Sequence, residues 1–219
     1  MKRVLEPELM DDERQSIAYA KADFSTSNQF FVDSLIRDFP GHLRRAIDIG
    51  CGPGDVVIRL ARAVPDLQIT AIDGSAPMVA LAREAVRAAG LDDRVSVVQG
   101  YLPGSSLEST GFDAVLSKDL LHHLPDPSVL WREITRLGRP GAAAYVMDLV
   151  RPDTPDAARQ IVDAVASRED PILREDFYNS LLAAFTVDEV QRQLIDNDLA
   201  FEVTRVSDRH MVIRGLTSP

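Results

Sequence analysis

From residue 42 to residue 150, short apolar segments typical of strands alternate with amphipathic segments typical of helices, and this alternation most constrains the fold. The predicted strands of this region are residues 46–49, 67–72, 95–98, 112–116 and 143–149. Parallel strands need long crossover connections, and helical crossovers cover both faces of a sheet. We therefore predict an α/β fold with a doubly wound, mostly parallel sheet of Rossmann-like type.

The segment before this core is helical in pattern. Residues 1–41 contain helical segments at about 11–22 and 28–39, and we expect them to form an N-terminal helical cap. Tyr19 and Phe24 either belong to a lid over a ligand or pack between these helices.

The segment after the core departs from strict alternation. Residues 151–219 begin with helical segments and end with two short strands, 201–206 and 211–213, which are predicted to pair as an antiparallel hairpin. The hairpin brings the predicted sheet to seven strands. No long linker is visible, so residues 1–219 are predicted to form one domain around the core at 42–150.

The composition narrows the classes of function. The chain has 34 acidic and 24 basic residues, a net charge of −10, which argues against a nucleic-acid partner or an anionic membrane surface. The lone cysteine, Cys51, cannot form an intrachain disulfide, and neither a signal peptide nor a membrane span is visible. We therefore expect a cytoplasmic protein.

A glycine-rich loop follows the first core strand. Gly50, Gly52 and Gly54 lie within five residues, so the loop can turn tightly and let a ligand lie against the main chain. The dinucleotide fingerprint G-x-G-x-x-G fails in every register, which argues against a nicotinamide oxidoreductase. The pattern is D-x-G-x-G-x-G beginning at Asp48, which suits a zwitterionic ligand that carries positive charge. Asp73, at the end of the second strand, can accept both hydroxyls of a ribose.

At these residues the chain resembles the class I S-adenosylmethionine-dependent methyltransferases, and the likeness runs from about Leu43 to the final hairpin. The resemblance implies that Asp48 and the glycine loop, Cys51 included, hold the methionine end of S-adenosylmethionine. It also implies that Asp73, followed by Gly74, holds the ribose and that Met78 packs on the adenine.

Of two later segments, the first departs from the family's pattern and the second resembles it. Such families often carry Gly-Asp after the third strand, with the acid on the adenine amino group. Here Gly100 is followed by Tyr101 and Leu102, so we expect backbone N–H groups to replace that contact. The segment that begins with Ser117 and Lys118 resembles the family's stretch beside the transferring methyl group.

The candidate catalytic residues are His122, His123 and Asp148, any of which could serve as a general base. A thiolate acceptor needs no base, whereas a phenol, amine or carbon acid usually does. Adjacent residues on a helix point about 100° apart, and no Cys or Glu has ligand spacing to the two histidines, so we expect no metal site.

The tail supplies the candidates for binding the methyl acceptor. Arg151 could clamp an anion, and Tyr178 and His210 lie where such enzymes build their acceptor pocket; each also has an ordinary structural interpretation. Apolar residues of the tail helices predict either a partly hydrophobic pocket or the interface of a homodimer. A small-molecule methyl acceptor is our first hypothesis. The alternatives are RNA or protein methylation and a non-catalytic, cofactor-binding regulatory protein.

Overall fold

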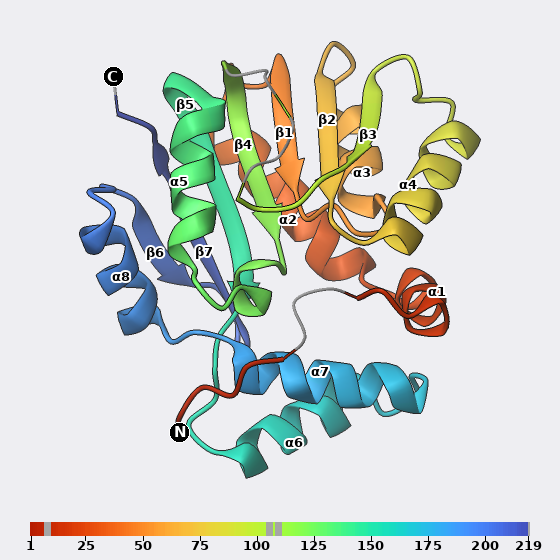
Figure 1. The fold of residues 1–219 in the computed structure, drawn as a ribbon, viewed down its shortest axis with the longest axis vertical. Helices are drawn as coiled ribbons and strands as arrows, with labels where there is room; N and C mark the ends of the chain where they lie inside the picture. The colour runs from red at the N-terminus through yellow and green to blue at the C-terminus, as the bar shows by residue number, and fades with distance from the viewer. Residues whose placement is uncertain (7–9, 104–106, 108–110, 219) are drawn as a thin grey trace.

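The computed structural model describes residues 1–6, 10–103, 107 and 111–218, and within them a seven-stranded sheet forms the centre of the molecule (Figure 1). The strand order is β3-β2-β1-β4-β5-β7-β6. The strands are β1 (Arg45–Ile49), β2 (Gln68–Asp73), β3 (Val95–Gln99), β4 (Phe112–Lys118), β5 (Gly138–Leu149), β6 (Glu202–Arg205) and β7 (His210–Leu216). The first five are parallel, and β7 runs antiparallel to both β5 and β6. The predicted mostly parallel sheet with a C-terminal antiparallel hairpin is confirmed.

The helices follow the predicted alternation. They are α1 (Glu13–Lys21), α2 (Ser25–Asp38), α3 (Asp55–Ala63), α4 (Ala76–Ala88), α5 (Ser128–Leu137), α6 (Pro155–Val165), α7 (Pro171–Ala183) and α8 (Val187–Asp196). The predicted start of α2 at residue 28 was wrong. The Ser25 amide donates to Asp23 Oδ1 at 2.9 Å, so the helix begins three residues earlier.

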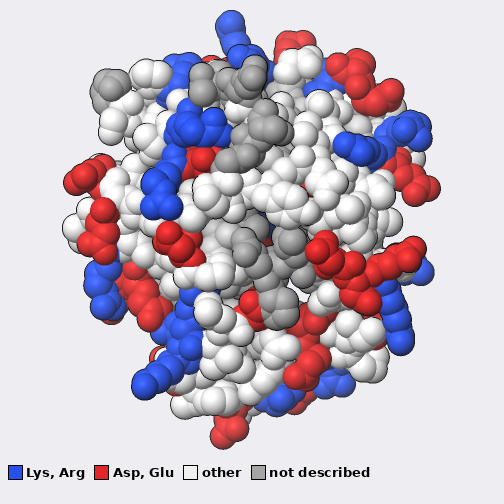
Figure 2. All heavy atoms as spheres, viewed as in Figure 1, with Lys and Arg blue, Asp and Glu red and all other residues white. Residues whose placement is uncertain are grey.

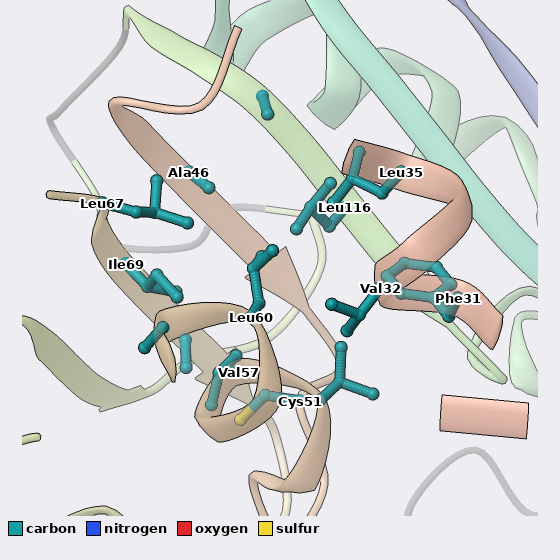
Figure 3. Close-up of a cluster of buried hydrophobic side chains, with 14 of the residues drawn as sticks. Phe31, Val32, Leu35, Ala46, Cys51, Val57, Leu60, Leu67, Ile69 and Leu116 are labelled. Atoms are coloured by element: carbon teal, nitrogen blue, oxygen red, sulfur yellow. The ribbon is translucent and has the colours of Figure 1, made fainter. Parts of the chain in front are cut away.

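Alternate side chains of β5 face opposite sides of the sheet. Tyr145 and Met147 belong to a core cluster with side chains from α2, α3 and α4, whereas Ala144 and Val146 belong to a cluster with α5 and α8. Figure 3 shows part of the first cluster, where Leu60 of α3 lies among the labelled side chains of α2 and the strands. Burial on both faces defines a doubly wound sheet.

Helices α1, α6 and α7 gather beyond the end of the sheet at which β1 and β4 terminate (Figure 1). A third cluster joins Leu149 of β5 to Val162 of α6 and Leu181 of α7. The carboxyl edge of the sheet, where ligands bind in open α/β folds, is therefore enclosed by helices from both ends of the chain. No helix in the described ranges combines the length and apolar character needed to cross a membrane.

Candidate cofactor and methyl-acceptor site

The loop between β1 and α3 has a backbone conformation that favours glycine at three positions. All three have positive φ: +78° at Gly50, +51° at Gly52 and +90° at Gly54. A Cβ on Gly50 would lie 3.0 Å from the Leu120 side chain, whereas a Cβ on Gly52 would meet no atom within 4 Å. Gly52 therefore faces open space, and Gly50 allows the segment after β4 to approach the loop.

Asp48 places a buried carboxylate beside this loop. Its side chain is 1% exposed, and Oδ1 has no hydrogen-bond partner among the described residues. Burial raises the pKa of Asp48 to about 7, helped by the negative charge of Asp73 and opposed by Lys118. A buried acceptor oxygen without a donor is costly, so Asp48 fits a ligand that brings an ammonium group.

Asp73 has a structural task that sequence reasoning did not assign. Its Oδ2 accepts the Gly52 N–H at 2.8 Å, and its Oδ1 accepts the Ser75 N–H at 2.9 Å. The carboxylate thereby ties the glycine loop to the beginning of α4. Each oxygen keeps lone-pair capacity for a further donor, so the predicted ribose contact remains compatible with this role.

Most of the predicted cofactor residues line one divided cleft above the loop. The larger group of lining residues comprises Gly50, Gly52, Asp73, Gly74, Met78, Gly100, Tyr101, Leu102 and Lys118, and the adjoining part adds Asp48 and Cys51. Tyr19 of α1 lines both parts, which supports its interpretation as part of a lid.

The other two predicted cofactor residues do not line the cleft. Ser117 is buried and donates to the Ile49 carbonyl at 2.8 Å, and Gly54 caps α3 against Ala82. These two residues hold the two ends of the loop in place through contacts outside the cleft. Cys51 packs into the core, as Figure 3 shows for its sulfur, and burial raises the pKa of its thiol. A buried thiol with a raised pKa fills space in the loop and is a poor nucleophile.

A separate cavity of about 520 Å³ adjoins the cleft. Met10, Tyr19, Asp119 and His123 line the cavity and the cleft together. The apolar residues of its wall include Phe24, Phe30, Met147, Leu149, Val165, Leu173 and Phe177. Its polar residues include Asp23, Asp119, His122, His123, Glu169, Asp176, Arg209 and His210. Of the apolar residues of α7, Leu173 and Phe177 thus face a pocket, and a partly hydrophobic pocket was one of the two predicted interpretations of the tail.

Only one of the three predicted acceptor-binding residues reaches this cavity. His210 lines it, but Arg151 is buried in an ion pair with Glu189 at 2.6 Å and is absent from the wall of each described cavity. Its backbone N–H donates to the Phe185 carbonyl at 3.0 Å, and its guanidinium contacts Glu189 of α8 rather than the cleft.

Tyr178 was also misplaced by sequence reasoning. Its ring lies beneath the guanidinium of Arg159, 3.7 Å from the ring centroid, and packs against α6 outside the described cavities. Phe177 lines the cavity, and the next residue on a helix points about 100° away.

The three predicted catalytic residues do come together. His122 Nδ1 lies 2.7 Å from Asp148 Oδ1, and Asp148 Oδ2 accepts the Leu121 N–H at 2.8 Å. Asp148 is buried behind His122, whereas His122 and His123 line the cavity. The carboxylate therefore fixes the orientation of one imidazole, and the pair of imidazoles forms a polar edge of the cavity.

The geometric reason for expecting the two histidines to diverge was wrong. They lie in a 3-10 turn, Leu121–His123, and their ring centroids are 4.3 Å apart at an interplanar angle of 34°. Both rings face Glu6, a residue that sequence reasoning missed because it is separated from them by more than a hundred positions. Burial raises the pKa of Glu6 to about 7. Burial also lowers the pKa of His122, but Asp148 and Glu6 outweigh this effect and raise it to about 9.

The fold and the cleft define a class of protein. Residues 46–141 match the family model described as a methyltransferase domain. This match and the curated relatives indicate the class I S-adenosylmethionine-dependent methyltransferases, the family that the motif predicted, and S-adenosylmethionine is the cofactor of that family.

Named relatives are similar over part of their length. The chain is 31% identical over 150 residues to 27-O-demethylrifamycin SV methyltransferase of Amycolatopsis mediterranei, covering 68% of this chain and 52% of the relative. It is 35% identical over 110 residues to the ubiquinone biosynthesis O-methyltransferase of Xanthomonas oryzae pv. oryzae, covering 49% of this chain and 44% of the relative. The chain therefore spans about half the length of these curated relatives.

Solved structures show the same fold at low identity. A SAM-dependent methyltransferase from Aquifex aeolicus superposes with a TM-score of 0.69 at 19% identity, covering 94% of this chain and 98% of that one. The plantazolicin methyltransferase, solved with a triazolic desmethyl analogue and SAH, gives a TM-score of 0.70 at 14% identity, covering 94% of this chain and 91% of that one.

Proposed function

We propose that this chain transfers a methyl group from S-adenosylmethionine to a hydroxyl group of a small, partly apolar molecule. The observation that carries the proposal is the junction between the two spaces. The cleft that contains Asp48, Gly52 and Asp73 opens at Tyr19 and His123 onto the cavity of about 520 Å³. Typical small-molecule sites have volumes of this order.

The described residues suit the parts of the cofactor. Asp48 would accept the ammonium of the methionine end, and Asp73 the ribose hydroxyls. Met78 would pack on the adenine, and the backbone of Tyr101 and Leu102 would replace the missing acidic contact. The bound cofactor supplies a methyl group that its sulfonium already activates. The protein then contributes chiefly alignment and the exclusion of water, which can account for much of the rate.

The apolar wall and the histidine edge indicate the kind of methyl acceptor. Phe24, Leu173 and Phe177 offer apolar contact, and His122, oriented by Asp148, offers a polar group beside the junction. A hydroxyl acceptor must lose a proton as the methyl group arrives, so polar groups are needed at this position. The two named relatives support oxygen as the acceptor atom, since one is named an O-methyltransferase and the other is named for a 27-O-demethyl compound.

The surface supports a small acceptor over a nucleic acid. On the face shown in Figure 2, basic side chains are interspersed with acidic ones and form no continuous stripe. The net charge of −10 also argues against a nucleic-acid acceptor, because neutralisation of phosphates by basic side chains supplies much of the affinity for nucleic acids.

The test is an S-adenosylhomocysteine-release assay over hydroxylated aromatic and polyketide-like compounds, with amines, thiols, nucleosides, RNA and protein as comparison classes. We expect turnover with hydroxylated compounds and a raised KM in Phe177→Ala, with cofactor affinity unchanged because Phe177 lines only the cavity. Turnover confined to RNA or protein, or silence across the panel in a protein that binds the cofactor, would contradict the proposal.

A further inference from the structure

Glu6, His122 and His123 converge at the edge of the methyl-acceptor cavity. Glu6 Oε1 lies 3.5 Å from His122 Nε2 and 3.4 Å from His123 Nδ1. One potential ligand atom from each residue lies within 4.8 Å of the others. The carboxyl side chain of Glu6 is 8% exposed, so this convergence is buried.

The separations are too long for a good charge-assisted contact. Such hydrogen bonds between imidazolium and carboxylate have lengths of about 2.7–2.9 Å. Glu6 Oε2 is bonded to the Ser180 hydroxyl at 3.2 Å, but Oε1 has no hydrogen-bond partner among the described residues. Glu6 Oε1 is thus a buried carboxylate oxygen that is aimed at two imidazole nitrogens without a hydrogen bond to either.

The same separations fit a metal-ligand set. Two ligand atoms that are each about 2.1 Å from a tetrahedral ion lie about 3.4 Å from one another. Two imidazoles and one carboxylate, with a fourth position left open, form a common zinc-binding set in enzymes. The contacts of 3.4 and 3.5 Å are therefore those expected across the edges of such a site.

The surrounding contacts hold the three side chains in place. His122 Nδ1 bonds to Asp148 at 2.7 Å, which is the outer-shell carboxylate contact that fixes metal-binding histidines. Arg3 Nη2 donates to the carbonyls of His122 at 2.7 Å and Leu124 at 3.0 Å. The short segment that supplies Glu6 is thus bonded directly to the turn that supplies both histidines.

We propose that Glu6, His122 and His123 bind one divalent transition-metal ion of the zinc type. The nitrogen-rich donor set favours such an ion over magnesium or calcium, which prefer oxygen ligands. Because both histidines line the cavity, the ion borders the methyl acceptor and lowers the pKa of a hydroxyl that binds it. This last role rests on the proposed function, whereas metal binding itself does not.

The test uses the full chain, stripped with a chelator and titrated with Co²⁺, whose visible absorption reports tetrahedral coordination. We expect one ion per chain, displaced by Zn²⁺. Glu6→Gln and His123→Asn should each weaken Co²⁺ binding by at least about ten-fold, since even outer-shell changes cost about 10–100-fold. The matched controls, Glu13→Gln on the exposed surface of α1 and His42→Asn after α2, should leave binding unchanged.

Two results would overturn the proposal. One is a parent protein that takes up no Co²⁺ at stoichiometric ratio, which needs no variant to interpret. The other is binding that survives Glu6→Gln or His123→Asn in protein whose circular dichroism matches the parent. Affinity for S-adenosylhomocysteine, measured by calorimetry on the same samples, reports separately on the methyltransferase proposal.

Discussion

Lowering the pH through the neutral range should weaken cofactor binding through one side chain, Asp48. The pKa of this carboxyl is raised to about 7 in the cofactor-free protein, because it is buried and lies near Asp73. The cofactor's ammonium needs the ionised carboxylate, so the binding-competent fraction falls as the pH falls below about 7. A carboxyl with its ordinary pKa of 3.8 would stay ionised throughout this range.

The magnitude follows from the protonated fraction. With a pKa of about 7, the apparent dissociation constant is proportional to 1 + 10^(pKa − pH). Between about pH 7 and about pH 5.5 this factor grows by roughly an order of magnitude, equivalent to about 1–2 kcal/mol of binding free energy. The cofactor's own amino group has a pKa of about 8 and stays charged throughout this window.

Isothermal titration with S-adenosylhomocysteine across this pH range is the assay. Asp48→Asn is the matched control, because it keeps the shape of the side chain and leaves every other titrating group in place. We expect weak, nearly pH-independent binding in the variant. An unchanged parent affinity between these pH values would refute the reasoning, as would a variant with the parent's pH dependence.

Three further predictions concern the loop and its carboxylates. Gly52→Ala should cost about 1 kcal/mol of stability because of its positive φ, and it should also abolish most of the cofactor affinity. Gly41 also has a positive φ and open space around it, so Gly41→Ala should carry only the stability cost. Equal cofactor affinity in the two variants, measured by calorimetry, would contradict this prediction. Asp73→Ala should abolish cofactor binding and also lower the melting temperature, since two backbone N–H groups lose their acceptor; near-parent affinity would remove the ribose assignment. Because the folded-state pKa of Asp48 is above 3.8, this carboxyl favours folding at acidic pH, and that stability is lost as the pH rises to about 7. In the cofactor-free parent, the free energy of unfolding should therefore fall by up to about 4 kcal/mol through Asp48 as the pH rises, and Asp48→Asn should lack this decrease. Denaturant unfolding at several pH values measures it, and parallel stability curves for parent and variant would count against the prediction.

The parts of the fold that depend on local pattern could be predicted from the sequence. The period-two burial of β5 and the glycine loop after β1 are each encoded within a few consecutive residues. The seven strands and the pairing of the last two therefore followed from apolar spacing and turn residues. The start of α2 was missed because Asp23, whose carboxylate accepts the Ser25 N–H just before the helix, looked like part of a polar break.

The site was less accessible to such reasoning where it depends on long-range placement. Phe177 and Tyr178 are neighbours in the sequence, but the phase of α7 sends only Phe177 into the cavity. Arg151 follows β5 closely, yet its backbone bonds to Phe185 and its side chain pairs with Glu189, which lies 38 positions later in the sequence. Glu6 contacts the histidines from more than a hundred positions away in the sequence, and no local pattern signals it.

A crystal structure with S-adenosylhomocysteine bound would test the account most directly. We predict the product's amino group at Asp48 Oδ1, its ribose against Asp73, and its sulfur directed toward the cavity at Tyr19 and His123. A product molecule located away from the glycine loop, or one whose sulfur is turned from that cavity, would contradict the account.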